Sequence, residues 1–279
     1  MLLTLVALLA LEFADLDPRL SAPPVRDPAP DSGGASFRPS SSGPALRPKR
    51  VELPSRSALA KARRYAGGRS GAVSFAVADA RGRIRGLGGA RQLPSASLVK
   101  AMIMVAYLNR IERREEELTG WGRARLEAMI RWSDNAAAGE LHRLVGSEGL
   151  MRVSRRVHMR HFIAAPAWGS STVTANDQVR FFVRVDRLVR PRHRGELRRL
   201  LRTVVPAQRW GIPDATNRRW TVLFKGGWRP TARGNLVNQA AKLERGSREL
   251  AIAVLSDGNP SHEYGTETVR GIAARLAGR

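Results

Sequence analysis

Residues 97–111 constrain the fold most, because a helix in this segment would be apolar on every side. Its apolar residues are Leu98, Val99, Ala101, Met102, Ile103, Met104, Val105, Ala106 and Leu108. A helix without a polar face is usually buried inside a protein. No apolar run in the chain approaches the ~18 residues of a membrane span. We therefore expect other elements of the chain to cover this helix.

The rest of the sequence predicts the helices and strands that can cover this helix, and their order indicates the fold class. A helix is predicted at 57–65 and two strands at 73–77 and 84–87, joined by a turn at 81–83. Helices follow at 122–131, 136–144, 147–158, 175–189 and 194–204, then strands at 220–225, 236–243 and 250–255 and a helix at 263–276. This order predicts an α/β (α+β) fold, with an antiparallel five-stranded sheet flanked by helices and an all-helical subdomain.

The first 56 residues have a different composition. Residues 2–11 form an apolar stretch about as long as the core of a signal peptide, although no Lys or Arg precedes it. Residues 1–16 are interpreted as a signal peptide or apolar N-terminal segment, which favours a secreted or cell-envelope protein, with the cytoplasm as the alternative. Residues 17–56 are rich in Pro, Ser and Gly and predict a disordered linker. The folded domain is expected over 57–279.

The charge of the chain is strongly positive, with 48 Lys and Arg against 24 Asp and Glu. Such a charge attracts anionic polymers and surfaces. Only five of the 48 are Lys, however, so a coding bias that scatters Arg over a solvated surface also explains the excess. We expect loose association with an anionic wall or membrane surface, no specific nucleic-acid partner, and a monomer.

Cysteine and histidine usage excludes several site types. The chain has no Cys, so disulfides, cysteine-ligated metals and thiol catalysis are excluded. Its five His residues are scattered, and none has the i, i+4 spacing of a helical zinc site with an intervening acid. His158 and His161 are expected on a solvated face. No metal or cofactor is predicted.

Three short motifs carry the chemistry. Ser97 and Lys100 lie three residues apart at the start of the apolar helix, so their side chains share a face and can hydrogen-bond. Serine is a weak nucleophile until a base removes its proton, and a buried lysine with a lowered pKa can be that base. Arg cannot, because it stays protonated in proteins. This pair predicts nucleophilic catalysis; its alternative is a helix N-cap with an exposed Lys.

The other two motifs are Ser133-Asp134-Asn135 at a helix boundary and Lys225-Gly226-Gly227 at the predicted end of a strand. By chance, about 0.4 Ser-x-x-Lys matches but only about 0.02 Ser-Asp-Asn matches are expected in this composition. The second motif therefore carries most of the signal. Its alternative is a helix cap or turn, and the alternative for the third is a strand that ends in a turn.

In order and spacing, the three motifs resemble those of the class A β-lactamases and the wider superfamily of penicillin-recognising serine enzymes, over roughly residues 57–279. The resemblance implies that Ser97 is the acylated nucleophile, Lys100 its base and Ser133 the proton donor to the leaving nitrogen. It further implies substrate-binding roles for these residues: Asn135, Lys225, Gly227, Trp228 and Arg233. Backbone N–H groups of Ser97 and Trp228 would form the oxyanion hole, and Arg233 would be an auxiliary carboxylate clamp.

Two departures from the family pattern bear on function. Gly226 replaces the Thr or Ser whose hydroxyl binds a substrate carboxylate. The Glu-x-x-Leu-Asn motif, which activates the deacylating water, is missing: between Asn135 and Thr174 the carboxylates are Glu140 and Glu148, both in helical patterns. The resemblance therefore implies a serine hydrolase that acts on β-lactams or related cell-wall (peptidoglycan-like) amides and deacylates slowly. The alternative is a catalytically inactive module of the same fold that binds an anionic polymer.

Overall fold

The computed structural model describes residues 53–216 and 219–277. The predictions for residues 1–16 and for nearly all of the 17–56 linker lie outside these ranges. Within them, no helix combines the length and the apolar content that a membrane crossing requires.

The elements follow the predicted order. The helices are α1 Arg56–Gly67, α2 Lys100–Arg113, α3 Gly120–Arg131, α4 Asn135–Arg156, α5 Ala175–Phe182, α6 Pro191–Arg202, α7 Ile212–Ala215 and α8 His262–Ala277. The strands are β1 Ala72–Asp79, β2 Ile84–Leu87, β3 Leu93–Pro94, β4 Thr172–Val173, β5 Thr221–Thr231, β6 Gly234–Arg245 and β7 Arg248–Asn259. Short 3₁₀ turns are η1 Ala96–Val99, η2 Trp168–Ser170, η3 Val185–Arg187 and η4 Pro206–Gln208.

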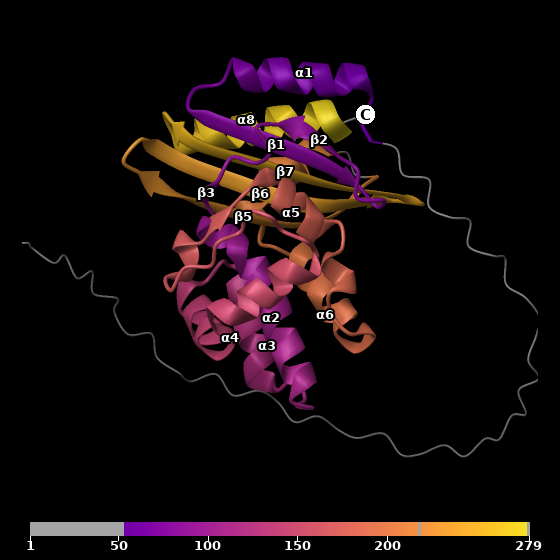
Figure 1. The fold of residues 1–279 in the computed structure, drawn as a ribbon, viewed down its shortest axis with the longest axis vertical. Coiled ribbons are helices and arrows are strands. Elements are labelled where there is room, and N and C mark those ends of the chain that lie inside the picture. Colours follow the sequence, from indigo (N-terminus) through magenta and orange to yellow (C-terminus); the bar gives the residue numbers. More distant parts are fainter. Residues whose placement is uncertain (1–52, 217–218, 278–279) are drawn as a thin grey trace, which may run out of the picture. The chain divides into compact units, whose positions relative to one another are not determined.

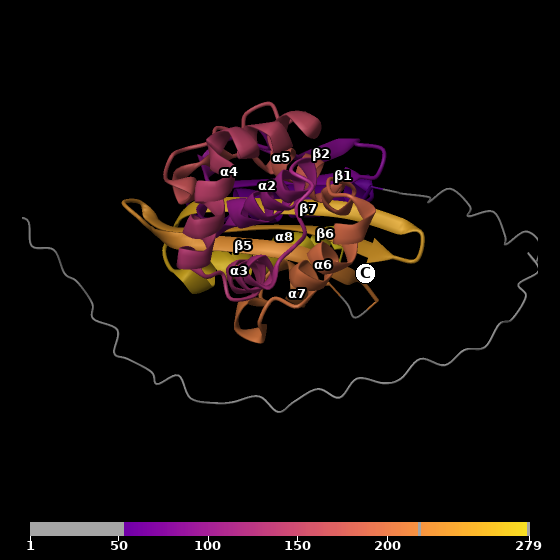
Figure 2. The same cartoon turned by 90° about the horizontal axis from the view of Figure 1, so that it is seen from below.

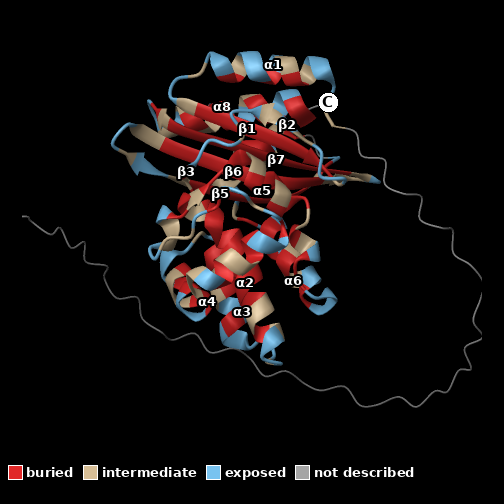
Figure 3. Cartoon of the chain, viewed as in Figure 1, coloured by how far each residue is buried: buried red, intermediate tan, exposed pale blue. Residues whose placement is uncertain are grey.

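One five-stranded antiparallel sheet organises the molecule, as predicted. Its order is β2-β1-β7-β6-β5, so the first strands of the domain pair with the last one. Helices α1 and α8 lie on one face of the sheet, and the region α2 to α6 lies on the other (Figures 1 and 2). Because both faces are covered, the central strands are buried almost throughout rather than on alternate residues (Figure 3).

Helix α2 is the centre of the helical region, which confirms the prediction from its apolar pattern. Its residues from Lys100 to Leu108 are all buried, and α4 packs alongside it. The helix begins later than expected, since residues 96–99 form the 3₁₀ turn η1 and regular α-helix starts only at Lys100. The side chain of Ser97 is therefore presented by a tight turn that leads into a buried helix.

Two other expectations need correction. The helix predicted over 175–189 ends at Phe182, because Arg184 leaves the helical conformation (φ −117°, ψ 3°). This turn brings the carboxylate of Asp186 within 2.9 Å of the buried Lys242 Nζ on β6. The prediction that Lys225-Gly226-Gly227 ends a strand is also wrong, since β5 continues to Thr231 and pairs with β6 along its whole length.

Asn238 connects the sheet to the segment that precedes η1. Its side chain is fully buried on β6, and Nδ2 donates to the Pro94 carbonyl at 2.8 Å. Its Oδ1 accepts from the Ser256 N–H at 3.2 Å. One amide thus satisfies two buried backbone groups and fixes the approach of the η1 segment to β6.

We predict that Asn238→Ala destabilises the domain by about 2–3 kcal/mol, because two buried backbone groups lose their partner. For a domain of this size the melting temperature should fall by roughly 4–12 °C. Thermal unfolding followed by circular dichroism measures the change. An unaltered melting temperature would show that the amide is not needed to hold this segment.

Candidate active site

Ser97 lies in the turn η1, beside an unusual backbone conformation. Ala96, the preceding residue, has φ of 45°, a region that residues other than glycine adopt rarely. Such strain persists where the surrounding structure holds the chain in place. Ser97 is half-buried, and no described residue forms a hydrogen bond with its hydroxyl. The turn therefore presents an unengaged hydroxyl at the start of α2.

Lys100 extends from the first residue of α2 and is completely buried. Its Nζ contacts the Ser133 carbonyl, the Ser133 Oγ at 3.2 Å and the Asn135 Oδ1 at 2.8 Å. An ammonium group has three N–H donors, and these three acceptors use them all. The hydrogen bond expected between Ser97 and Lys100 is consequently not formed in this arrangement.

The Ser133-Asp134-Asn135 motif forms the connection from α3 to α4. Ser133 has φ of 61°, and Asp134 caps α4 by accepting the Ala137 N–H at 2.6 Å. The helix cap thus makes the sharp turn that directs Ser133 and Asn135 towards Lys100. For this motif the capping alternative and the site are compatible, because different residues serve each.

Lys225 approaches the same hydroxyl from the sheet. It is buried on β5, and its Nζ lies 3.1 Å from Ser133 Oγ and 2.9 Å from the Gly226 carbonyl. Two residues further, the backbone of Gly227 lies directly against η1: a Cβ built there would be 2.7 Å from the Ser97 nitrogen and 2.6 Å from the Leu98 nitrogen. Only glycine permits this approach, which places β5 beside Ser97.

Burial changes the acidity of both amines. It lowers the pKa of Lys100 to about 8, although the charge of Asp134 opposes the change. Burial together with the positive charge of Lys100 lowers the pKa of Lys225 to about 7. Near neutral pH the pair therefore holds fewer than two protons. The sequence pattern indicated Lys225 only as a cation, whereas burial lowers the proton affinity of this amine as well.

The sequence reasoning missed Trp168. This residue begins η2 in the connection between α4 and α5, and its ring centroid lies 4.9 Å from Lys100 Nζ. An indole face at this distance favours a cation over it. The surrounding segment 163–171 contains no acidic residue. A single tryptophan in that acid-free segment was the available signal.

Trp228, Trp132 and Arg233 differ from one another in burial and in their contacts. Trp228 is half-buried and packs edge-on against Trp210, with ring centroids 5.4 Å apart. Trp132 is 51% exposed. The Arg233 guanidinium, in the turn between β5 and β6, pairs with the buried Asp257 carboxylate of β7, and its role as a carboxylate clamp stays a prediction.

Metal binding has no visible basis within 53–216 and 219–277, where no group of three or more His, Asp or Glu side chains could hold an ion. His158 and His161 are exposed, as expected. The side chains brought together at the site supply two hydroxyls, two buried amines and an amide.

Solved structures of other proteins share the fold of this chain. A β-lactamase from Xanthomonas campestris superposes with a TM-score of 0.68 at 18% identity, covering 78% of this chain and 96% of its own. One from Chitinophaga pinensis gives 0.69 at 14% identity, covering 79% and 98%, and the protein PBP-A gives 0.68 at 18%, covering 83% and 97%. At these identities the likeness establishes the fold. No curated protein sequence matches the chain.

The family evidence comes from the sequence itself. The profile of the "Beta-lactamase enzyme family" matches residues 123–279, more than half of the chain. The match contains Ser133 and Lys225, while Ser97 and Lys100 precede it. This match shows that the chain belongs to the beta-lactamase enzyme family.

Proposed function

We propose that the chain is an acyl-transferring serine hydrolase that opens a β-lactam, or a related amide of the cell wall, through an ester on Ser97. The observation that carries this proposal is the placement of two buried amines around one serine hydroxyl, next to the half-buried Ser97. Burial of two lysines against the same oxygen destabilises the fold. A role as the base in catalysis accounts for this arrangement.

The proposed reaction moves one proton in a closed path. Neutral Lys100 takes the proton of the Ser97 hydroxyl as its oxygen bonds to the amide carbonyl carbon. The C–N bond then breaks, and the nitrogen receives a proton from Ser133, which is replenished from the amines 3.1 and 3.2 Å away. This step requires the Lys100 Nζ to turn from its present acceptors towards Ser97.

The second requirement is to stabilise the negative charge that develops on the carbonyl oxygen. The backbone N–H groups of Ser97 and Trp228 are the proposed donors, and the approach of Gly227 to η1 brings the two chain segments together. Removing one such donor typically costs ~3–4 kcal/mol of transition-state stabilisation. The substrate carboxylate would meet Lys225. It would have no hydroxyl contact at position 226, because Gly226 has no side chain.

Deacylation is proposed to be slow. Glu140 pairs with Arg125 at 2.6 Å, and Glu148 pairs with Arg152 and Arg155, so neither is a free base. Trp168 lies over Lys100 from the segment that holds no acid. Absence of a general base costs roughly 10²–10⁴ in rate, which would let the acyl-enzyme accumulate. A cell-envelope location fits such a substrate.

We predict that incubation with penicillin adds the mass of one intact penicillin, and that the adduct persists for minutes or longer. Intact-mass spectrometry measures both, with Ser97→Ala as the control that shows no adduct. Steady turnover of a chromogenic cephalosporin without a burst would contradict slow deacylation. A wild-type protein that is never acylated would instead favour the inactive binding module.

The rate of acylation should rise with pH through about 7 to 8 and then level off. The pKa values of Lys225 and Lys100 are lowered to about 7 and about 8, and the neutral amine that acts as base becomes more abundant as pH increases through that range. Stopped-flow measurements from pH 6 to 9.5 test this, with Lys100→Arg expected to lose acylation at every pH. A flat profile in the wild type would reject an amine base.

A pair of glycine variants tests the geometry. Gly226→Ala should retain acylation, because its Cβ would make ordinary contacts of 3.5 and 3.6 Å with side chains of Gln239 and Trp228. Gly227→Ala places a Cβ 2.6–2.8 Å from backbone atoms of residues 95–98 and should slow acylation by roughly 10²-fold. Equal rates for the two variants would show that the β5–η1 approach is not required.

A further inference from the structure

A second hollow lies away from the proposed active site, between the C-terminal half of α2 and α4. Its volume is about 280 Å³, and its lining residues are Ala106, Asn109, Arg113, Gly149, Arg152, Val153, Arg155 and Arg156. Arg113 is thirteen residues beyond Lys100, which corresponds to roughly 20 Å along a helix. The hollow is therefore separate from the Ser97 site and independent of its function.

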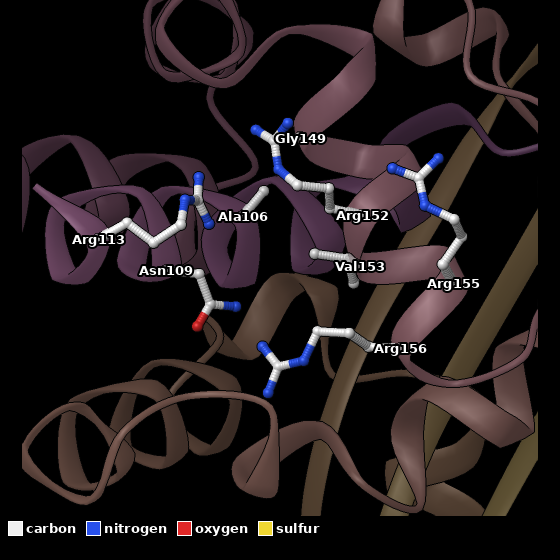
Figure 4. A pocket seen from close by; sticks show the side chains of 8 residues that line it. All are labelled: Ala106, Asn109, Arg113, Gly149, Arg152, Val153, Arg155 and Arg156. Carbon is white, nitrogen blue, oxygen red and sulfur yellow. The ribbon is translucent and has the colours of Figure 1, made fainter.

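Helical spacing explains why arginines converge here. Arg152 and Arg156 are four residues apart on α4, and Asn109 and Arg113 are four apart on α2, so each pair shares one helix face. Figure 4 shows the guanidinium ends of Arg113, Arg152 and Arg156 around the same space. Gly149 has no side chain at the α2 contact; a Cβ there would lie 3.6 Å from the Cβ of Ala106. The hollow thus has a small-residue floor and a cationic rim.

The positive charge in this hollow is only partly compensated. Arg155 pairs with Glu148, but among the described residues Arg113 has no carboxylate partner, and Arg156 donates to the Leu188 carbonyl at 2.9 Å. Arg152 reaches Glu148 only at 3.5 Å, and its buried Nε has no hydrogen-bond partner. Burial, and then the charges of Arg152, Arg110 and Arg156, lower the pKa of Arg113. Like charges therefore lie close together in this part of the fold.

A larger neighbouring hollow extends this surface. Its volume is about 690 Å³, and it shares Asn109, Arg113 and Arg156 with the first. Its further lining residues are Glu112, Arg187, Leu188, Val189, Arg190, Pro191 and Arg194. The one acid of this lining, Glu112, pairs with Arg192 at 2.8 Å and with Arg190 at 3.6 Å, and Arg187 pairs with Glu249 at 3.2 Å. We call the two hollows together the arginine groove.

We propose that the arginine groove binds an oligophosphate chain, that is, several phosphate groups in a row without nucleobases. The guanidinium fork matches phosphate oxygens in two parallel hydrogen bonds, and the groove offers such forks one after another. Its lining contains no aromatic side chain on which a base could stack. Coding bias alone scatters arginines over the surface, whereas here they surround one connected space.

The experiment is isothermal titration of the full chain with sodium tripolyphosphate at low salt. The double variant Arg113→Gln with Arg152→Gln should bind at least about tenfold more weakly, because two charged contacts to the phosphates are lost. The control is Arg56→Gln with Arg64→Gln on exposed positions of α1, which changes net charge equally. Equal weakening in both variants, or in neither, would overturn the site.

Two further measurements test the charge repulsion in the groove and the class of its ligand. Without ligand, the melting temperature of the Arg113/Arg152 double variant should equal or exceed that of the wild type, because repulsion is relieved; a lower value would make these arginines structural and overturn the proposal. An oligothymidylate of fifteen nucleotides should bind more weakly than tripolyphosphate per phosphate. Stronger binding of the oligonucleotide would overturn the assignment to a ligand without bases.

Discussion

The arrangement depends on two lysine amines, Lys100 and Lys225, that are buried on either side of one hydroxyl. Neither amine forms an ion pair with a carboxylate of the described residues, although the charge of Asp134 offsets part of the loss of water at Lys100. The charge of Lys100 further lowers the proton affinity of Lys225. Lys100 comes from the central helix and Lys225 from the sheet, so the contact at Ser133 joins the two halves of the domain. Any displacement between sheet and helices would change the acidity of both groups.

Three residues that position the main chain hold the contact between the two lysines and Ser133 in place. Asp134 caps α4 and fixes the turn at Ser133, Gly227 lets β5 lie against η1, and Asn238 fastens the segment before η1 to β6. Each of them sets the position of the chain rather than touching a reacting atom. The position of Ser97 is thus set by how the sheet, the turn η1 and the helices pack, rather than by hydrogen bonds of its own side chain.

The sequence was sufficient for most of the fold and for the residues that meet at Ser133. The all-apolar stretch at 98–108 required burial, and the order of strands and helices allowed one antiparallel sheet. It was insufficient where long-range contacts decide local structure. The break at Arg184 brings Asp186 to a lysine on a distant strand, β5 extends past Gly227 because β6 pairs with it, and Trp168 reaches Lys100 through the fold alone. The grouping of arginines between α2 and α4 likewise appears only when the two helices are packed.

The depressed proton affinity of the two lysines has an evolutionary consequence. A lysine that binds its proton less tightly in the folded chain than in the unfolded chain weakens the fold at neutral pH, and the penalty fades as the solution becomes more alkaline. Replacing either amine with an apolar side chain of similar length would relieve that tension. A chain that retains both buried lysines therefore retains them at the expense of its own stability.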